Sequence, residues 1–221
     1  MAIQVKICGI TSVEAADAAA RAGADFVGLV FHVRSPRNVT SDQAARLASR
    51  LRGRTRLVCL LSDPQDDDVG KALAATKADY IQLHGRETPE RVGALRARFG
   101  KPVIKAIAIA EAADFACVPA YEAVADMLLF DARSPTAAER EGGHGSPFDW
   151  QLLCGRMFKR PWLLAGGLNA DNVARAVRTA GAPGVDVSSG VEAVPGLKSA
   201  ELITTFVANA RAAQFVPEHN A

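Results

Sequence analysis

Short apolar runs alternate with alanine-rich stretches along this 221-residue chain. The runs are rich in β-forming residues, and the stretches between them have helical spacing. The expected strands are Ile3–Cys8, Phe26–Phe31, Arg56–Leu61, Tyr80–Leu83, Val103–Ile107, Met127–Asp131, Trp162–Ala165 and Val185–Ser188. The expected helices are Ser12–Ala22, Ser41–Leu51, Pro64–Ala75, Pro89–Phe99, Asp171–Ala180 and Ala200–Ala212.

This order of elements predicts parallel pairing through right-handed crossovers, because strands that are separated by helices cannot form hairpins. Eight such units close a barrel, so the expected fold class is α/β, a single-domain (β/α)8 TIM barrel over residues 1–213. Residues 214–221 are expected to form a C-terminal tail, either ordered or disordered. The alternative is an open doubly wound sheet, which usually begins with a glycine-rich dinucleotide-binding turn that is absent after the first strand.

Charge and hydropathy exclude several classes of partner. The chain has 26 lysine and arginine residues against 24 aspartate and glutamate residues, and they form no basic stripe that would follow a nucleic-acid backbone. No apolar run approaches the ~18 residues of a membrane span, and the N-terminus lacks the pattern of a signal peptide. We expect a cytoplasmic protein without nucleic-acid or membrane partners, either a monomer or a homodimer.

The four cysteines, Cys8, Cys59, Cys117 and Cys154, are scattered without CxxC spacing. This pattern indicates free thiols and argues against a zinc site or a disulfide framework. The four histidines have no ligand spacing either, so we expect no metal and no cofactor. Cys59, Cys117 and Cys154 are expected to be buried, because cysteine is among the most buried residue types.

The ends of the expected strands are the first place to search for function, because barrel active sites lie at the C-terminal ends of the strands. Seven of the eight expected strands are followed by a polar or glycine-rich cluster. These clusters are 6–9, 35–37, 82–85, Lys105, 131–133 with 142–145, 166–169 and 186–190. Thr11 or Ser12, Ser41 and Asn169 are plausible N-caps of the helices that follow such ends.

The chain contains, in order, the motifs KICGIT, QLHG, LLFDA, GGHG with FDW, LAGGLN and GVDVSSGVE with PG. This ordered set resembles that of the phosphoribosylanthranilate isomerase family and extends from residue 5 to residue 196. The resemblance implies an enzyme of tryptophan biosynthesis that opens the furanose ring of N-(5-phosphoribosyl)anthranilate. An enol-amine then tautomerises to 1-(2-carboxyphenylamino)-1-deoxyribulose 5-phosphate, an Amadori rearrangement that implies no redox cofactor or metal.

Such a rearrangement needs an acid that protonates the ring oxygen and a base that removes a proton from the neighbouring carbon. By the family match, Cys8 is the general base and Asp131 is the general acid. A cysteine acts as a base when it is a thiolate, which partial exposure near positive charge favours. Lys6 has the same parity as Cys8, so both should face the barrel interior, where Lys6 either sets the electrostatics or pairs with a carboxylate.

Further candidates bind the substrate. Arg37 is the family-matched residue for the anthranilate carboxylate, which calls for a planar bidentate donor. The phosphate needs backbone N–H donors that can approach it closely. Gly166, Gly167, Ser189 and Gly190 fit the phosphate site that barrels commonly build from their last two loops.

Three other polar residues have less definite roles. His84 either bonds the substrate or satisfies loop carbonyl groups. Asp186 either supports the sugar hydroxyls or has a structural role. His144 stands where the family more often has a small residue in its GG-x-G loop, which leaves the contact made by that loop open.

Two other functions stay open at this stage. Another phosphosugar-processing TIM-barrel enzyme, such as the related indole-forming synthase or a pentose-phosphate epimerase, would want a catalytic lysine with glutamates, or metal-binding histidines, at its strand ends. A non-catalytic phosphosugar-binding barrel is the other, because a fold alone does not give a function. The presence of both Cys8 and Asp131 favours the isomerase.

Overall fold

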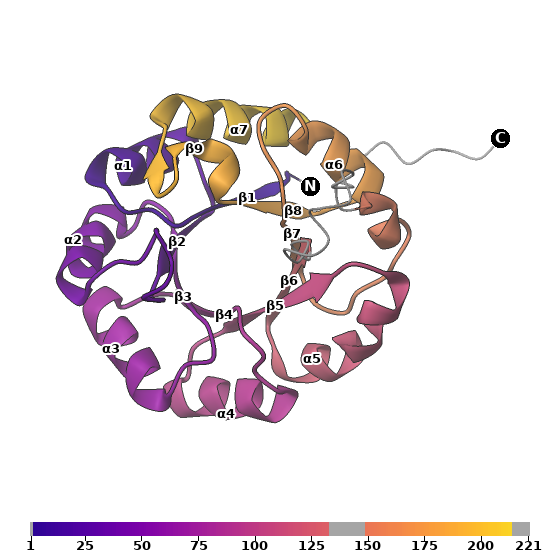
Figure 1. The fold of residues 1–221 in the computed structure, drawn as a ribbon, viewed down its shortest axis with the longest axis horizontal. Helices are drawn as coiled ribbons and strands as arrows, with labels where there is room; N and C mark the ends of the chain where they lie inside the picture. Colours follow the sequence, from indigo (N-terminus) through magenta and orange to yellow (C-terminus); the bar gives the residue numbers. More distant parts are fainter. Residues whose placement is uncertain (1, 133–148, 214–221) are drawn as a thin grey trace.

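The computed structural model describes residues 2–132 and 149–213 of the chain. Its eight parallel strands close into a barrel in chain order, with β1 paired to both β2 and β8 (Figure 1). The strands are β1 (Gln4–Cys8), β2 (Phe26–Val30), β3 (Arg56–Leu61), β4 (Tyr80–Leu83), β5 (Val103–Ile109), β6 (Met127–Ala132), β7 (Trp162–Leu164) and β8 (Gly184–Val187). The predicted (β/α)8 barrel is confirmed, and the doubly wound alternative is wrong.

The helices surround the barrel on its outer side (Figure 1). They are α1 (Val13–Ala22), α2 (Ser41–Leu51), α3 (Asp66–Thr76), α4 (Pro89–Phe99), α5 (Val118–Val124), α6 (Val173–Ala180) and α7 (Ala200–Ala212). Short 3-10 segments are η1 (Ala112–Cys117), η3 (Trp150–Leu153) and η4 (Ser189–Val191). Within the described residues, no helix is long and apolar enough to cross a membrane.

The strands separate the apolar core into two clusters, because successive side chains of a strand point to opposite faces. The larger cluster lies between the strands and the helices and includes Val5 and Ile7 of β1. The smaller cluster fills the barrel and consists of Phe26, Val58, Ile104, Ala106, Met127, Leu129, Leu163 and Ala165, with Tyr80 packed against it. Lys6 and Cys8 alternate with Val5 and Ile7, so they face the barrel interior as their parity predicts.

Side-chain hydroxyl groups begin several helices. Ser12 accepts a hydrogen bond from the Ala15 N–H and caps α1, as predicted. For α2 the prediction of Ser41 is wrong, because Thr40 is the cap and Ser41 is already helical. The α6 helix begins only at Val173, but Asn169 accepts from two N–H groups of the turn before it.

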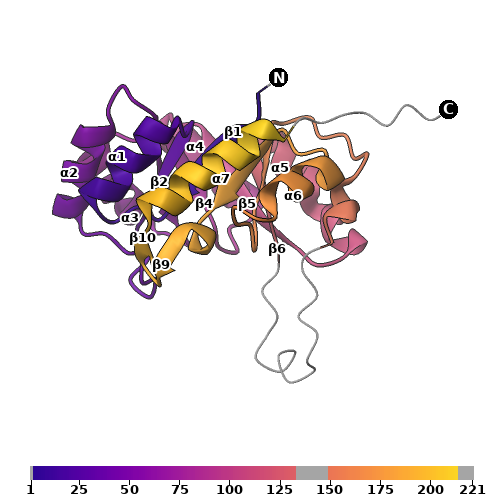
Figure 2. The same cartoon turned by 90° about the horizontal axis from the view of Figure 1, so that it is seen from above.

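Two regions contain elements that the sequence pattern did not predict. The connection between β5 and β6 forms η1 and the seven-residue helix α5, which has a proline in its first turn. A proline and a short length leave little helical periodicity to detect. A small hairpin of β9 (Glu192–Val194) and β10 (Leu197–Lys198) follows β8. It lies at the end of the barrel opposite the N-terminus of the chain (Figure 2).

Candidate active site

The candidate base Cys8 lies at the end of β1 beside a buried ion pair. The Lys6 ammonium is 0% exposed and donates to Asp186 Oδ1 over 2.8 Å. A Cβ atom on Gly28 would lie 2.9 Å from Cys8 Sγ and 3.3 Å from Lys6 Nζ. Gly28 therefore provides the space that these two side chains occupy. Lys6 thus pairs with a carboxylate and also borders the Cys8 thiol.

Burial dominates the environment of Cys8, which is only 4% exposed. Burial raises the pKa of the Cys8 thiol, while the charges of Lys6 and Lys198 oppose that increase. Burial alone would lower the pKa of Lys6, but the effect of the Asp186 carboxylate is to raise it, and the pKa of Lys6 is raised overall. Positive charge therefore lies beside the thiol, but the partial exposure that would also favour a thiolate is absent, because Sγ turns into the barrel at the strand end.

Arg37 lies in the loop after β2 and is held by the hairpin that follows β8. Its Nε and Nη2 donate to the two carboxylate oxygens of Glu192 over 2.6 and 2.8 Å. Lys198 donates to the same carboxylate over 2.7 Å and to the Ser188 carbonyl over 2.9 Å. The Glu192 carboxylate thus occupies Nε and Nη2 of Arg37, and 23% of the Arg37 side chain remains exposed.

Two features hold Arg37 over the end of β1. Gly9 has a φ of +78°, and a Cβ atom there would lie 2.5 Å from Arg37 Cδ, so glycine is needed for both conformation and space. Burial alone would raise the pKa of Glu192, but Arg37 and Lys198 lower it to about 2. The carboxylate is therefore ionised near neutral pH. Glu192 and Lys198 were missed by the sequence analysis, although Glu192 ends the quoted motif GVDVSSGVE.

The candidate acid Asp131, at the end of β6, is paired with His84, which follows β4. The distance between His84 Nε2 and Asp131 Oδ2 is 3.0 Å, and both side chains are about one third exposed, at 33% and 30%. The fully buried Gln82 approaches the other ring nitrogen, with 3.0 Å between its Nε2 and His84 Nδ1. His84 therefore contacts the candidate acid itself, a partner that the sequence analysis did not consider.

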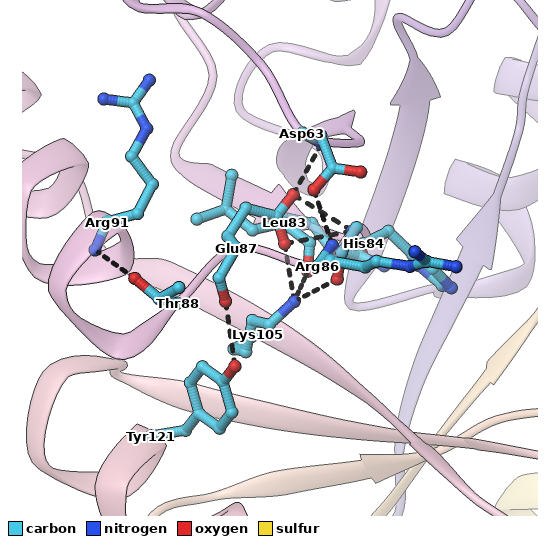
Figure 3. Close-up of polar contacts among 11 residues, drawn as sticks. Asp63, Leu83, His84, Arg86, Glu87, Thr88, Arg91, Lys105 and Tyr121 are labelled. Carbon is cyan, nitrogen blue, oxygen red and sulfur yellow. Dashed lines mark hydrogen bonds and ion pairs between the residues drawn. The ribbon is translucent and has the colours of Figure 1, made fainter.

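A buried ion pair fixes the loop that contains His84 (Figure 3). Lys105 Nζ donates to Glu87 over 2.6 Å and to the Gly85 carbonyl over 2.8 Å. Glu87 in turn accepts from the N–H groups of Asp63 and Gly85, and Tyr121 donates to the Glu87 carbonyl over 2.9 Å. The sequence places Lys105 at a strand end but predicts no role for it. In the structure it stabilises the backbone next to His84.

Replacing Lys105 by methionine is expected to lower the free energy of unfolding by about 3–5 kcal/mol, because Glu87 then remains as a buried charge without its partner. Lys71→Met is the control, since Lys71 is exposed on α3, and its expected change is within about 0.5 kcal/mol. Urea unfolding followed by circular dichroism measures both. Equal stabilities of the two variants would contradict the assigned role of the pair.

The predicted phosphate loops lie side by side after β7 and β8. Gly166 and Gly167 have φ values of +89° and +63°, which favour glycine. A Cβ atom on Gly190 would lie only 1.9 Å from the Leu168 carbonyl oxygen, so the two loops touch there. The predicted helix begins at Asp171, but α6 begins at Val173, so a turn separates Gly167 from the helix. Ser189 begins η4.

Other expectations concern metals, cysteines and residues outside the described ranges. Residues 2–132 and 149–213 contain no group of three or more His, Cys, Asp or Glu side chains that could hold a metal ion. All four cysteines are free thiols, but Cys117 and Cys154 are exposed, so their predicted burial is wrong. Both lie in short helical connections and not in the barrel.

His144, the GGHG loop and the tail 214–221 lie outside the described residues.

Comparison with known proteins gives consistent results. The family model for N-(5'phosphoribosyl)anthranilate (PRA) isomerase matches residues 5–209. N-(5'-phosphoribosyl)anthranilate isomerase of Paramagnetospirillum magneticum is 50% identical over 211 residues, which are 96% of this chain and 98% of that protein. The crystal structure of phosphoribosyl anthranilate isomerase from Thermotoga maritima is 34% identical, with a TM-score of 0.84 over 94% of this chain and 98% of that one.

A second solved structure shows such an isomerase with a bound ligand. It is a complex of phosphoribosyl anthranilate isomerase with reduced 1-(o-carboxyphenylamino)-1-deoxyribulose 5-phosphate. Its sequence identity to this chain is 32% and its TM-score is 0.81, over 94% of this chain and 98% of that one. The similarity therefore extends over nearly the full length of both chains.

Proposed function

The chain belongs to the N-(5'-phosphoribosyl)anthranilate isomerase family, and on that premise we propose that Cys8 and Asp131 perform its Amadori rearrangement. Cys8 is the general base and Asp131 is the general acid. The observation that supports this assignment best is their placement at the ends of β1 and β6, with Cys8 in the barrel interior and Asp131 bonded to His84. This arrangement would put a proton donor and a proton acceptor at the same end of one barrel.

Ring opening uses the acid. The lone pair of the anilino nitrogen forms a double bond to carbon 1, the bond from carbon 1 to the ring oxygen breaks, and that oxygen takes the proton of Asp131. Cys8 then removes the proton from carbon 2, and the electron pair of that C–H bond forms the enol-amine. Tautomerisation of the enol-amine gives the ketose, so the sequence of steps consumes no other reactant.

The surroundings of Cys8 support its role despite its burial. A thiolate formed there would lie beside the ammonium of Lys6 and near Lys198. These charges lower the pKa of Cys8 in part, against burial and Asp186, which raise it. Asp186 holds Lys6 over 2.8 Å, so in this proposal Asp186 orients a neighbouring group, although an additional bond to a sugar hydroxyl is compatible with its position. Close charges are more effective where water is excluded.

Arg37 is proposed to bind the anthranilate carboxylate through the guanidinium edge that Glu192 leaves open. Arg37→Lys is then expected to raise the substrate KM by roughly 10- to 100-fold, because a charge-assisted hydrogen bond contributes about 1.5–3 kcal/mol. Arg34→Lys in the same loop is the control, since Arg34 is exposed. Steady-state kinetics measures both variants, and an unchanged KM for Arg37→Lys would refute the role.

The phosphate is proposed to lie against the backbone of Gly166, Gly167, Ser189 and Gly190. Inorganic phosphate should then inhibit weakly and in competition with the substrate, because the same N–H groups would bind both. Potassium chloride at the same ionic strength is the control for a general salt effect. An absence of competition at high millimolar phosphate would argue against this site.

The test of the function is direct. Purified protein is supplied with freshly generated phosphoribosylanthranilate, and the expected result is its conversion to 1-(2-carboxyphenylamino)-1-deoxyribulose 5-phosphate. The product is identified by mass and by its chromatographic retention. A folded chain that leaves the substrate unchanged would contradict the proposed function.

A further inference from the structure

Gln82, His84 and Asp131 form a hydrogen-bonded chain that begins inside the barrel and ends at the candidate acid. Gln82 and His84 are two residues apart on one strand end, so both side chains point to the same face. The two contacts, Gln82 Nε2 to His84 Nδ1 and His84 Nε2 to Asp131 Oδ2, are each 3.0 Å long. The mechanism above uses Asp131 and does not use Gln82.

The chemistry of the three groups gives this chain a direction. As the amide of Gln82 is placed, its nitrogen faces His84 Nδ1, and because an amide nitrogen only donates, Nδ1 accepts in this orientation. A neutral imidazole then carries its single proton on Nε2, which donates to Asp131 Oδ2. Each donor thus faces an acceptor, from the amide to the carboxylate.

The second amide atom of Gln82 supports this orientation. Gln82 Oε1 is buried and has no hydrogen-bond partner among the described residues. Turning the amide over would pair Oε1 with a protonated Nδ1, but it would put the amide nitrogen, with two N–H donors, at the buried position that has no described partner. The observed orientation therefore leaves the oxygen without a described partner and keeps the donor on His84. Such unsatisfied groups call for an explanation, and a role at the active site is one.

We propose that Gln82 is a positioning residue that fixes the Nε2–H tautomer of His84 and thereby directs the acidic proton of Asp131 to Oδ1. Because Oδ2 accepts from His84, the proton of the neutral carboxyl group lies on the other oxygen, which is the one left for the substrate. When that proton passes to the ring oxygen, the Nε2–H remains as a donor to the carboxylate that forms. The proposal rests on the proposed function of Asp131.

Several contacts hold the loop of His84 in place. The Glu87–Lys105 pair bonds the backbone on both sides of His84, and the His84 N–H donates to the Leu61 carbonyl over 2.9 Å (Figure 3). A Cβ atom on Gly85 would lie 2.5 Å from the Asp63 carboxyl group, so the loop is packed closely there. A fixed backbone leaves the partner of Nδ1 to determine the tautomer.

The ¹⁵N spectrum of the imidazole tests the proposal without any substrate. In the full-length protein at mildly alkaline pH, we expect His84 to show a protonated Nε2 and an unprotonated Nδ1, with the signals assigned by their loss in His84→Asn. Gln82→Glu has the same shape but only accepts, so we expect it to move the proton to Nδ1. It should lower kcat by at least ~10-fold, part of the general-acid contribution, with little change in KM.

Two further variants keep the test decisive if Gln82→Glu does not fold. Gln82→Met removes the donor without adding charge, and we expect kcat to fall by roughly 2- to 10-fold, the effect of one neutral hydrogen bond. Gln4→Met is the matched control, because Gln4 begins β1, at the end of the strand away from Cys8 and the candidate site. This variant should keep the parental kcat. A proton on Nδ1 of the parent, an unmoved proton in Gln82→Glu, or parental kcat in Gln82→Met would each overturn the proposal. If the parent does not isomerise the substrate, the proposed function fails, while the tautomer result still stands.

Discussion

Replacing Cys8 by alanine is expected to lower kcat for phosphoribosylanthranilate by at least ~100-fold, the lower end of what a positioned base contributes. The side chain is 4% exposed and borders the buried Lys6–Asp186 pair, so a water molecule that replaced the thiol would be a weaker base in a small space. Because burial raises the pKa of Cys8, the thiolate fraction of the parent increases with pH through the neutral range. The residual activity of Cys8→Ala should lack the corresponding rise in kcat/KM.

The control for this prediction is Cys59→Ala. Cys59 is also buried, but it lies on the helix-facing side of β3, where its Sγ contacts Thr76. That variant is expected to keep the parental kcat even if its thermal stability falls. If Cys8→Ala is fully active and unfolds normally, the isomerase function stands, but Cys8 is not its base. His84, Lys6 and Asp186 are then the first groups to test as the base.

Most of the barrel was predictable because each strand and helix has its own local pattern. The predicted β3 and β4 strands and the α2, α4 and α7 helices agree with the structure in both bounds. The β5 strand is longer than predicted and ends at Ile109. Its extra residues are paired with β6, where Ala108 lies opposite Asp131 and Ile109 opposite Ala132. Such a register is set by the neighbouring strand, so it cannot be read from the local sequence.

The site was predictable where strand parity applies. Lys6 and Cys8 face the barrel interior as expected, and the same i, i+2 relation would have placed Gln82 with His84. The contact between Arg37 and Glu192 joins residues 155 positions apart and depends on a hairpin with only a few residues per strand. Neither the hairpin nor its ion pair has a periodic signal, so only the structure places Glu192 and Lys198 beside Arg37.

The burial of Cys8 could not be predicted from the sequence. Parity assigns a side chain to a face, but the exposure at a strand end depends on which loops cover it. Here Arg37 lies over Gly9, and Lys198 bonds the backbone of Ser188, so the loops after β2 and β8 both approach the end of β1. The resulting environment combines low exposure with several positive charges.

Asp131→Asn is expected to lower kcat by at least ~100-fold, because the amide has nearly the same shape but cannot give up a proton to the ring oxygen. The amide oxygen of this variant would still accept from His84, so the loss would measure proton transfer and not the position of the loop. Asp126→Asn is the matched control, since Asp126 precedes the same strand at its other end and bonds Arg96 and the Val103 N–H. It should lose stability and keep kcat.

Proton transfer from Asp131 is needed only when the ring of the bound substrate opens, so Asp131→Asn should reduce kcat much more than it alters KM. Near-normal turnover would remove Asp131 as the acid and leave His84, its hydrogen-bonded partner, as the next group to test.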